Sequence, residues 1–128
     1  MAMVKDCILI DDDQDDQEIF LMALKDADTK IKCLTANDGV DGVKMLSDPS
    51  CAPRYIFIDI NMPKMNGIEC LRHIKKFDHI GSSRIIMYST SVNKGMINQC
   101  KELGADEFLV KPTAFAPLVA ALTNIFKR

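Results

Sequence analysis

The chain has 128 residues, of which 48% are hydrophobic, and a formal net charge of −2. This length fits one globular domain with a single core, and a charge so near neutrality argues against a nucleic-acid-binding surface. The apolar runs are far shorter than the ~18 residues needed to cross a bilayer, and the N-terminus has no signal-peptide core, so we expect a cytoplasmic protein that contacts neither nucleic acid nor membrane.

The first half of the chain alternates short apolar runs with segments of helical periodicity. Residues 7–10 predict a strand that leads directly into Asp11, and residues 14–27 carry apolar side chains at helical spacing. Residues 31–36 predict a second, more polar strand. A second helix is predicted from the spacing of Val40, Val43, Met45 and Leu46.

The second half repeats this alternation three times. The remaining strands are predicted over residues 55–59, 84–88 and 107–110. A helix is predicted to begin at Gly67, another spans residues 93–103 with Gly104 placed to cap it, and the last has Thr113 as its N-cap. The five cysteines form no C-x-x-C pair, so the sequence predicts neither a zinc site nor a disulfide framework.

Five strand-helix units in strict alternation predict an α/β fold, a parallel sheet with helices on both faces. Right-handed crossovers favour the flavodoxin-like strand order 2-1-3-4-5, a three-layer sandwich. In this order the second strand lies at an edge and the other four are contiguous. Reactive residues should therefore follow strands 1, 3, 4 and 5 at the carboxyl edge of the sheet.

The sequence places polar side chains at those four positions. Asp11 and Asp12 follow the first strand, Asp59 ends the third, Ser89 follows the fourth and Lys111 the fifth. Converging carboxylates repel one another, at about 1.4 kcal/mol for each pK unit of repulsion, so they need a cation. Ligation by oxygen atoms suits Mg²⁺, which completes its shell with water and phosphate oxygens.

This set of residues is suited to phosphoryl transfer onto a carboxylate. With a metal bound, Asp59 could attack the phosphorus of an anionic donor and form an acyl phosphate. Lys111 offers a second positive charge and Ser89 a hydroxyl donor for the phosphoryl oxygens.

Four motifs resemble the signature of the receiver domains of two-component response regulators, the CheY family. The motifs are residues 8–13, 57–67, 89–90 and 109–112. The resemblance spans essentially the whole chain and implies a single receiver domain over residues 1–128, without an output domain. It implies a phosphoryl donor that is a sensor histidine kinase or a histidine phosphotransfer protein. It also implies that the protein is not an enzyme, except that the domain catalyses its own phosphorylation and dephosphorylation.

The resemblance also assigns roles at the metal site. Asp59 is the phosphoacceptor, Asp12 a direct Mg²⁺ ligand and Asp11 a ligand through water. Asn61 contributes its backbone carbonyl. Asp15 and Asp16, by contrast, we interpret as a solvated acidic start of the first helix.

Further roles concern the phosphorylated state. Ser89 and Lys111 hold the phosphoryl group, Phe108 is an aromatic switch that turns inward, and the Lys111–Pro112 bond is cis. An unidentified downstream protein then reads the surface of helix 4, strand 5 and helix 5, where a homodimer can also form. Asn61 and Ser91, each two residues beyond a reactive position, are expected to set the lifetime of the acyl phosphate.

Three alternatives fit the residues less well. A phosphohydrolase of the haloacid dehalogenase type wants a second Asp two residues after the nucleophile, where this chain has Asn61, which cannot transfer a proton at neutral pH. A non-phosphorylated pseudo-receiver predicts the loss of at least one of Asp12, Asp59, Ser89 and Lys111, and all are present. In a flavodoxin, the acidic loop after the first strand would repel the cofactor phosphate.

Overall fold

The computed structural model describes residues 6–28, 30–91 and 93–127. The strands are Cys7–Ile10 (β1), Cys33–Ala36 (β2), Tyr55–Asp59 (β3), Arg84–Ser89 (β4) and Glu107–Val110 (β5). The helices are Gln14–Ala27 (α1), Gly39–Leu46 (α2), Gly67–Ile74 (α3), Lys94–Glu102 (α4) and Phe115–Phe126 (α5), with a short 3₁₀ turn at Asp78–Ile80. In the described part of the chain, no helix is both long and apolar enough to span a membrane.

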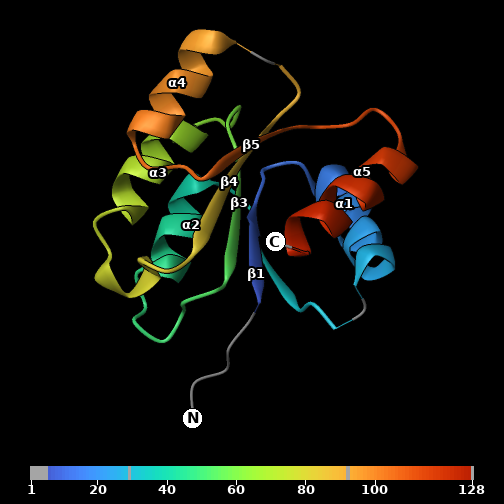
Figure 1. Ribbon diagram of the computed structural model, residues 1–128. Helices are drawn as coiled ribbons and strands as arrows, with labels where there is room; N and C mark the ends of the chain where they lie inside the picture. The colour runs from blue at the N-terminus through green and yellow to red at the C-terminus, as the bar shows by residue number, and fades with distance from the viewer. Residues whose placement is uncertain (1–5, 29, 92, 128) are drawn as a thin grey trace.

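The strands form one parallel sheet in the order β2-β1-β3-β4-β5, which confirms the predicted topology. Helices α1 and α5 cover one face, and α2, α3 and α4 cover the other (Figure 1). The parallel arrangement brings the carboxyl ends of the strands to one edge of the sheet.

Both faces of the sheet are buried, so its central strands are apolar on both sides. In β1, Ile8 and Ile10 pack into the core beneath α2 and α3, whereas Cys7 and Leu9 pack into the core beneath α1 and α5. All four side chains have no exposed surface. This burial explains the continuous apolar runs in the sequence, which are typical of parallel sheets with helices on both sides.

The helices begin at short polar side chains. Asp13, Asp38, Asn66 and Asn93 each accept hydrogen bonds from backbone N–H groups of the first turn of α1 to α4. The predicted cap at Thr113 is wrong. The N-cap residue of α5 is Ala114, which has an extended backbone. Its side chain has no oxygen to accept such a bond. At the other end of α4, Gly104 has φ +100°, as its predicted capping role requires.

Strand β2 is shorter than the predicted 31–36 because it lies at the edge and pairs only with β1. The register begins with Cys7 opposite Cys33. The N–H of Ile31 donates instead to the carbonyl of Asp28 at 3.3 Å, in a turn before the strand.

Candidate functional site

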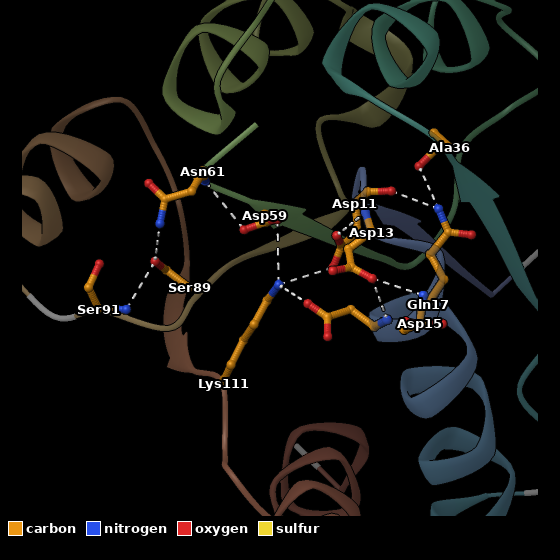
Figure 2. Close-up of polar contacts among 11 residues, drawn as sticks. Asp11, Asp13, Asp15, Gln17, Ala36, Asp59, Asn61, Ser89, Ser91 and Lys111 are labelled. Carbon is orange, nitrogen blue, oxygen red and sulfur yellow. Dashed lines mark hydrogen bonds and ion pairs between the residues drawn. The ribbon is translucent and has the colours of Figure 1, made fainter. Parts of the chain in front are cut away.

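The carboxyl ends of four strands bring the predicted reactive residues together. Asp11 follows β1, Asp59 ends β3, Ser89 ends β4 and Lys111 follows β5. In Figure 2 the Lys111 side chain extends from the end of β5 toward Asp59, with Asp11 on one side and Ser89 on the other. The edge strand β2 contributes no charged group to this cluster, as its position in the sheet predicted.

Asp59 is a buried carboxylate with few polar partners. Its side chain is only 7% exposed, and its Oδ2 lies 3.5 Å from the Lys111 ammonium. Its Oδ1 accepts a long hydrogen bond of 3.3 Å from the Asn61 N–H. Burial raises the pKa of Asp59 to about 7, with the Asp11 charge adding to the rise and the Lys111 charge opposing it. These two contacts do not offset the burial of the carboxylate, so a further cation would stabilise its charged form.

Asp11 is held rigidly beneath Asp59, whereas Asp12 faces solvent. The Asp11 side chain is fully buried; its Oδ1 accepts from the Asp13 N–H at 3.0 Å and its Oδ2 from Lys111 Nζ at 3.1 Å. Burial raises the pKa of Asp11, and these two hydrogen bonds oppose the rise. Asp12 is exposed.

The carboxylates of Asp11, Asp12 and Asp59 each offer an oxygen within 4.8 Å of the other two. Oxygen atoms at this spacing fit a small divalent cation such as Mg²⁺ or Mn²⁺. Lys111 is the neighbouring positive charge. One ammonium cannot neutralise three carboxylates, so the donor set and its charge both suit a metal. Asn61 is exposed and lies two residues after Asp59, in the loop that follows β3.

Ser89 is fully buried and weakly held. Its Oγ accepts from the Asn61 side-chain amide at 3.4 Å and from the Ser91 N–H at 3.4 Å. Both contacts are long for hydrogen bonds. In both contacts the Ser89 oxygen accepts, so its O–H can donate to an incoming acceptor without the loss of a strong partner.

Lys111 lies among three carboxylates. Its Nζ donates to Asp16 Oδ2 at 3.0 Å and to Asp11 Oδ2 at 3.1 Å, in addition to the 3.5 Å contact with Asp59. It also lies 4.9 Å from the centre of the Tyr88 ring. Burial works to lower the pKa of Lys111, but the hydrogen bond to Asp16 and the charges of Asp11 and Asp59 outweigh it and raise the pKa.

The predicted cis bond between Lys111 and Pro112 is wrong, because the structure has a trans bond there. An X–Pro bond prefers the trans form by about 0.5–1 kcal/mol when no contact selects the other isomer. Here the Lys111 N–H donates to the Ser89 carbonyl at 2.7 Å and its side chain reaches Asp59 with the trans bond in place.

Phe108 lies on β5 opposite Met87 of β4. Its side chain is partly buried and packs against the core beneath α2, α3 and α4. The Phe108 side chain therefore lies at the boundary between this core and the solvent.

Two residues near the site were not predicted. Asp16, interpreted from the sequence as a solvated residue, pairs with Lys111. Gln17 is buried, and its amide donates to the Asp11 carbonyl at 2.7 Å (Figure 2). The same amide also donates to Asn37 Oδ1 at 3.2 Å. The signal for Gln17 was its helical spacing from Phe20 and Leu24, which makes it a polar residue on an apolar face. No comparable signal identified Asp16.

The sequence is similar to those of known proteins. The family described as "Response regulator receiver domain" matches residues 7–123. The chain is 32% identical over 114 residues to the chemotaxis protein CheY of Thermotoga maritima, covering 88% of this chain and 93% of that protein. It is 28% identical over 116 residues to a probable CheY of Rhizobium etli, covering 88% of each.

Solved structures show the same fold. The phosphorylated cyanobacterial phytochrome response regulator RcpA has a TM-score of 0.85 at 24% identity, over 98% of this chain and 93% of that one. The Mn²⁺-bound response regulator Rcp1 has a TM-score of 0.80 at 23% identity, over 93% and 89%. The chain therefore belongs to the response regulator receiver domain family and has the family's role of phosphoryl acceptor in two-component signalling.

Proposed function

We propose that Asp59 is the phosphoacceptor of this receiver domain. The observation that carries the proposal is a buried carboxylate at the end of β3 that lies 3.5 Å from an ammonium and next to two further carboxylates. An Asp59 carboxylate oxygen attacks phosphorus, the bond from phosphorus to the donor's leaving atom breaks, and that atom keeps the bonding electron pair. The product is an acyl phosphate on Asp59.

The proposed donor is a phosphohistidine of a sensor histidine kinase or of a phosphotransfer protein. Asp11, Asp12 and Asp59, with the backbone carbonyl of Asn61, would hold Mg²⁺. When bound, this ion neutralises the carboxylates so that an anionic phosphoryl group can approach them. The family relationship and the all-oxygen donor set both support this assignment.

Ser89 and Lys111 are proposed to bind the transferred phosphoryl group. The Lys111 ammonium already lies beside Asp59, and the Ser89 hydroxyl has only two weak contacts to give up. A shift of Ser89 leaves room for Phe108, which is partly buried, to move further into the core. A partner protein, or a second copy of the domain, would then read the surface of α4, β5 and α5.

The lifetime of the acyl phosphate is proposed to depend on Asn61 and Ser91. Both residues are exposed, and both donate to the Ser89 Oγ. Their position beside Ser89 supports a role in controlling how water reaches the phosphoryl group. Replacing Ser91 should change the hydrolysis rate, and an unchanged rate would argue against this role.

The direct experiment is incubation with acetyl phosphate and Mg²⁺, followed by intact-mass measurement. We expect a mass gain of one phosphoryl group in the wild type that needs Mg²⁺ and is lost in Asp59→Asn. Asp12→Asn should lose most of the gain because it removes a metal ligand. A gain that persists in Asp59→Asn, or that does not depend on a divalent ion, would contradict the assignment.

A further inference from the structure

Lys111 has a partner that the proposed phosphoryl transfer does not use. Asp16 lies in the first turn of α1, and its Oδ2 accepts from Lys111 Nζ at 3.0 Å, the shortest of the three carboxylate contacts of that ammonium. The Asp16 side chain is 40% exposed, whereas Lys111 is 9% exposed and Asp11 fully buried. Asp16 is therefore the most exposed of the three carboxylates around Lys111.

The start of α1 fixes Asp16 in this place. The Asp13 carboxylate caps the helix by accepting from the N–H groups of Asp15 at 2.9 Å and Asp16 at 3.1 Å. Asp13 is itself tied to the buried Asp11 through its own N–H. The contact thus follows from a capped helix start, and it needs no strained geometry.

Asp16 also lines a groove next to Lys111. A groove of about 420 Å³ beside Lys111 is lined by Asp16, Tyr88 and Phe115 among other residues. Asp16 and Asp59 both contact Lys111 Nζ, so an anionic phosphodonor that reaches Asp59 comes close to the Asp16 carboxylate. Two like charges at such short range repel each other by an amount that exceeds thermal energy, even at the effective dielectric of a protein surface.

We propose that Asp16 is a positioning residue that competes for Lys111 and thereby slows phosphorylation and weakens retention of the phosphoryl group. An ammonium has three N–H donors, and in this structure two of them serve Asp16 and Asp11. A phosphoryl group on Asp59 must draw Lys111 away from Asp16, or share it. This inference rests on the proposed function and concerns the tuning of the same site.

The test compares Asp16→Asn, Asp16→Ala and the matched control Asp15→Asn. Asp15 carries the same charge in the same helical turn, is exposed, and within the described residues forms no ion pair. Rates of phosphorylation by acetyl phosphate are measured over a range of donor concentrations at saturating Mg²⁺. The affinity for beryllofluoride, a stable mimic of the phosphoryl group, is measured by NMR titration. Thermal unfolding checks that each variant is folded.

Both Asp16 variants should be phosphorylated about three- to tenfold faster at low donor concentration, as expected for removing one partly screened charge. The increase in rate should come mainly from a lower KM for acetyl phosphate. Beryllofluoride should bind more tightly by a similar factor. Asp15→Asn should change either quantity less than about twofold.

Two outcomes would overturn the inference while leaving the proposed function intact. In the first, the wild type and Asp15→Asn are phosphorylated normally, and the Asp16 variants are phosphorylated no faster than the wild type. The other is an Asp16→Ala variant that is slower and is rescued by Asp16→Asn, since this would make Asp16 a support for Lys111. A wild type that takes up no phosphoryl group on Asp59 overturns both proposals.

Discussion

Helices α1 and α4 lie on opposite faces of the sheet and differ in how firmly they are packed. Helix α1 buries Gln17, Phe20, Ala23 and Leu24, whereas α4 buries only Cys100. The Phe20 ring makes edge-to-face contacts with Phe57 at 5.0 Å and Tyr88 at 5.8 Å. The helix that follows Asp11 and Asp12 is thus anchored by aromatic packing, and the helix that follows Ser89 is not.

This difference separates the two tasks of the proposed switch. Asp11 and Asp12 must keep their spacing from Asp59, and they lie between β1 and the firmly packed α1. The surface that is proposed to change includes α4, which has few buried side chains to repack. Segments with little buried apolar surface move at low free-energy cost. The comparison therefore predicts that substitutions under α1 cost stability, while α4 tolerates them better.

The largest effect is expected from truncating the aromatic anchor. Phe20→Ala removes a fully buried ring and should lower the free energy of unfolding by about 3–5 kcal/mol. The matched change under α4, Cys100→Ala, removes much less buried volume and should cost about 1 kcal/mol. Urea unfolding followed by circular dichroism measures both. Equal losses in the two variants would remove the contrast between the helices.

The next largest effect concerns the loop that follows Asp59. Gly67 packs so closely against this loop that an added Cβ would lie 2.7 Å from the Ile60 Cα. Gly67→Ala must displace the backbone and should cost about 2–3 kcal/mol in unfolding free energy. Because the same backbone carries Asp59, phosphorylation should slow as well. Gly81→Ala, where the nearest contact is 3.3 Å, is the control and should change little. A Gly67→Ala variant of normal stability would show that the loop can move freely.

Asp59→Asn should raise the free energy of unfolding, whereas the two preceding substitutions lower it. The folded-state pKa of Asp59, about 7, lies above the model-compound value of 3.8. The folded protein thus binds this proton more tightly than the unfolded chain does. Protonation of Asp59 therefore stabilises the folded protein fully below pH 4, and this stabilisation is lost as pH rises through about 7. In metal-free buffer at pH 8, Asp59→Asn should be about 1–2 kcal/mol more stable than the wild type.

The pH dependence supplies the check on that prediction. The advantage of Asp59→Asn should shrink as pH falls from 8 to 5, because the wild-type carboxyl then carries its proton. Thermal unfolding at several pH values with EDTA present measures this difference. An advantage of the same size at every pH would mean that it does not arise from the charge of Asp59.

A smaller effect is expected at the polar residue of α1. Gln17→Met keeps the size of the side chain but removes the donor to the Asp11 carbonyl and to Asn37. We expect a loss of about 1 kcal/mol in unfolding free energy and weaker Mg²⁺ binding, since Asp11 loses a support. Isothermal titration with Mg²⁺ measures the binding, and Gln14→Met at an exposed position of the same helix is the control. An unchanged Mg²⁺ affinity would show that Gln17 does not support the metal site.

The sheet and the position of its reactive edge could be predicted because they follow from local patterns. Strict strand-helix alternation determined the topology, and the residues at the carboxyl ends of β1, β3, β4 and β5 then had to converge. Asp11, Asp59, Ser89 and Lys111 meet there for that reason. No side-chain detail was needed.

The features that sequence reasoning missed depend on side-chain geometry. The pairing of Asp16 with Lys111 joins residues 95 positions apart and depends on the rotation of α1 about its axis. The displaced cap of α5 at Ala114 and the trans Lys111–Pro112 bond are set by how the chain leaves β5. Residue types and spacing do not encode such local paths.

The central claim is that the buried carboxylate at the end of β3 takes the phosphoryl group. Phosphorylated protein should be treated with borohydride, which reduces an acyl phosphate to an alcohol, and the modified peptide should then be identified by mass spectrometry. The account predicts that Asp59 is converted to homoserine only after incubation with donor and Mg²⁺. Conversion at Asp11, Asp12 or Asp16 with Asp59 unmodified would contradict it.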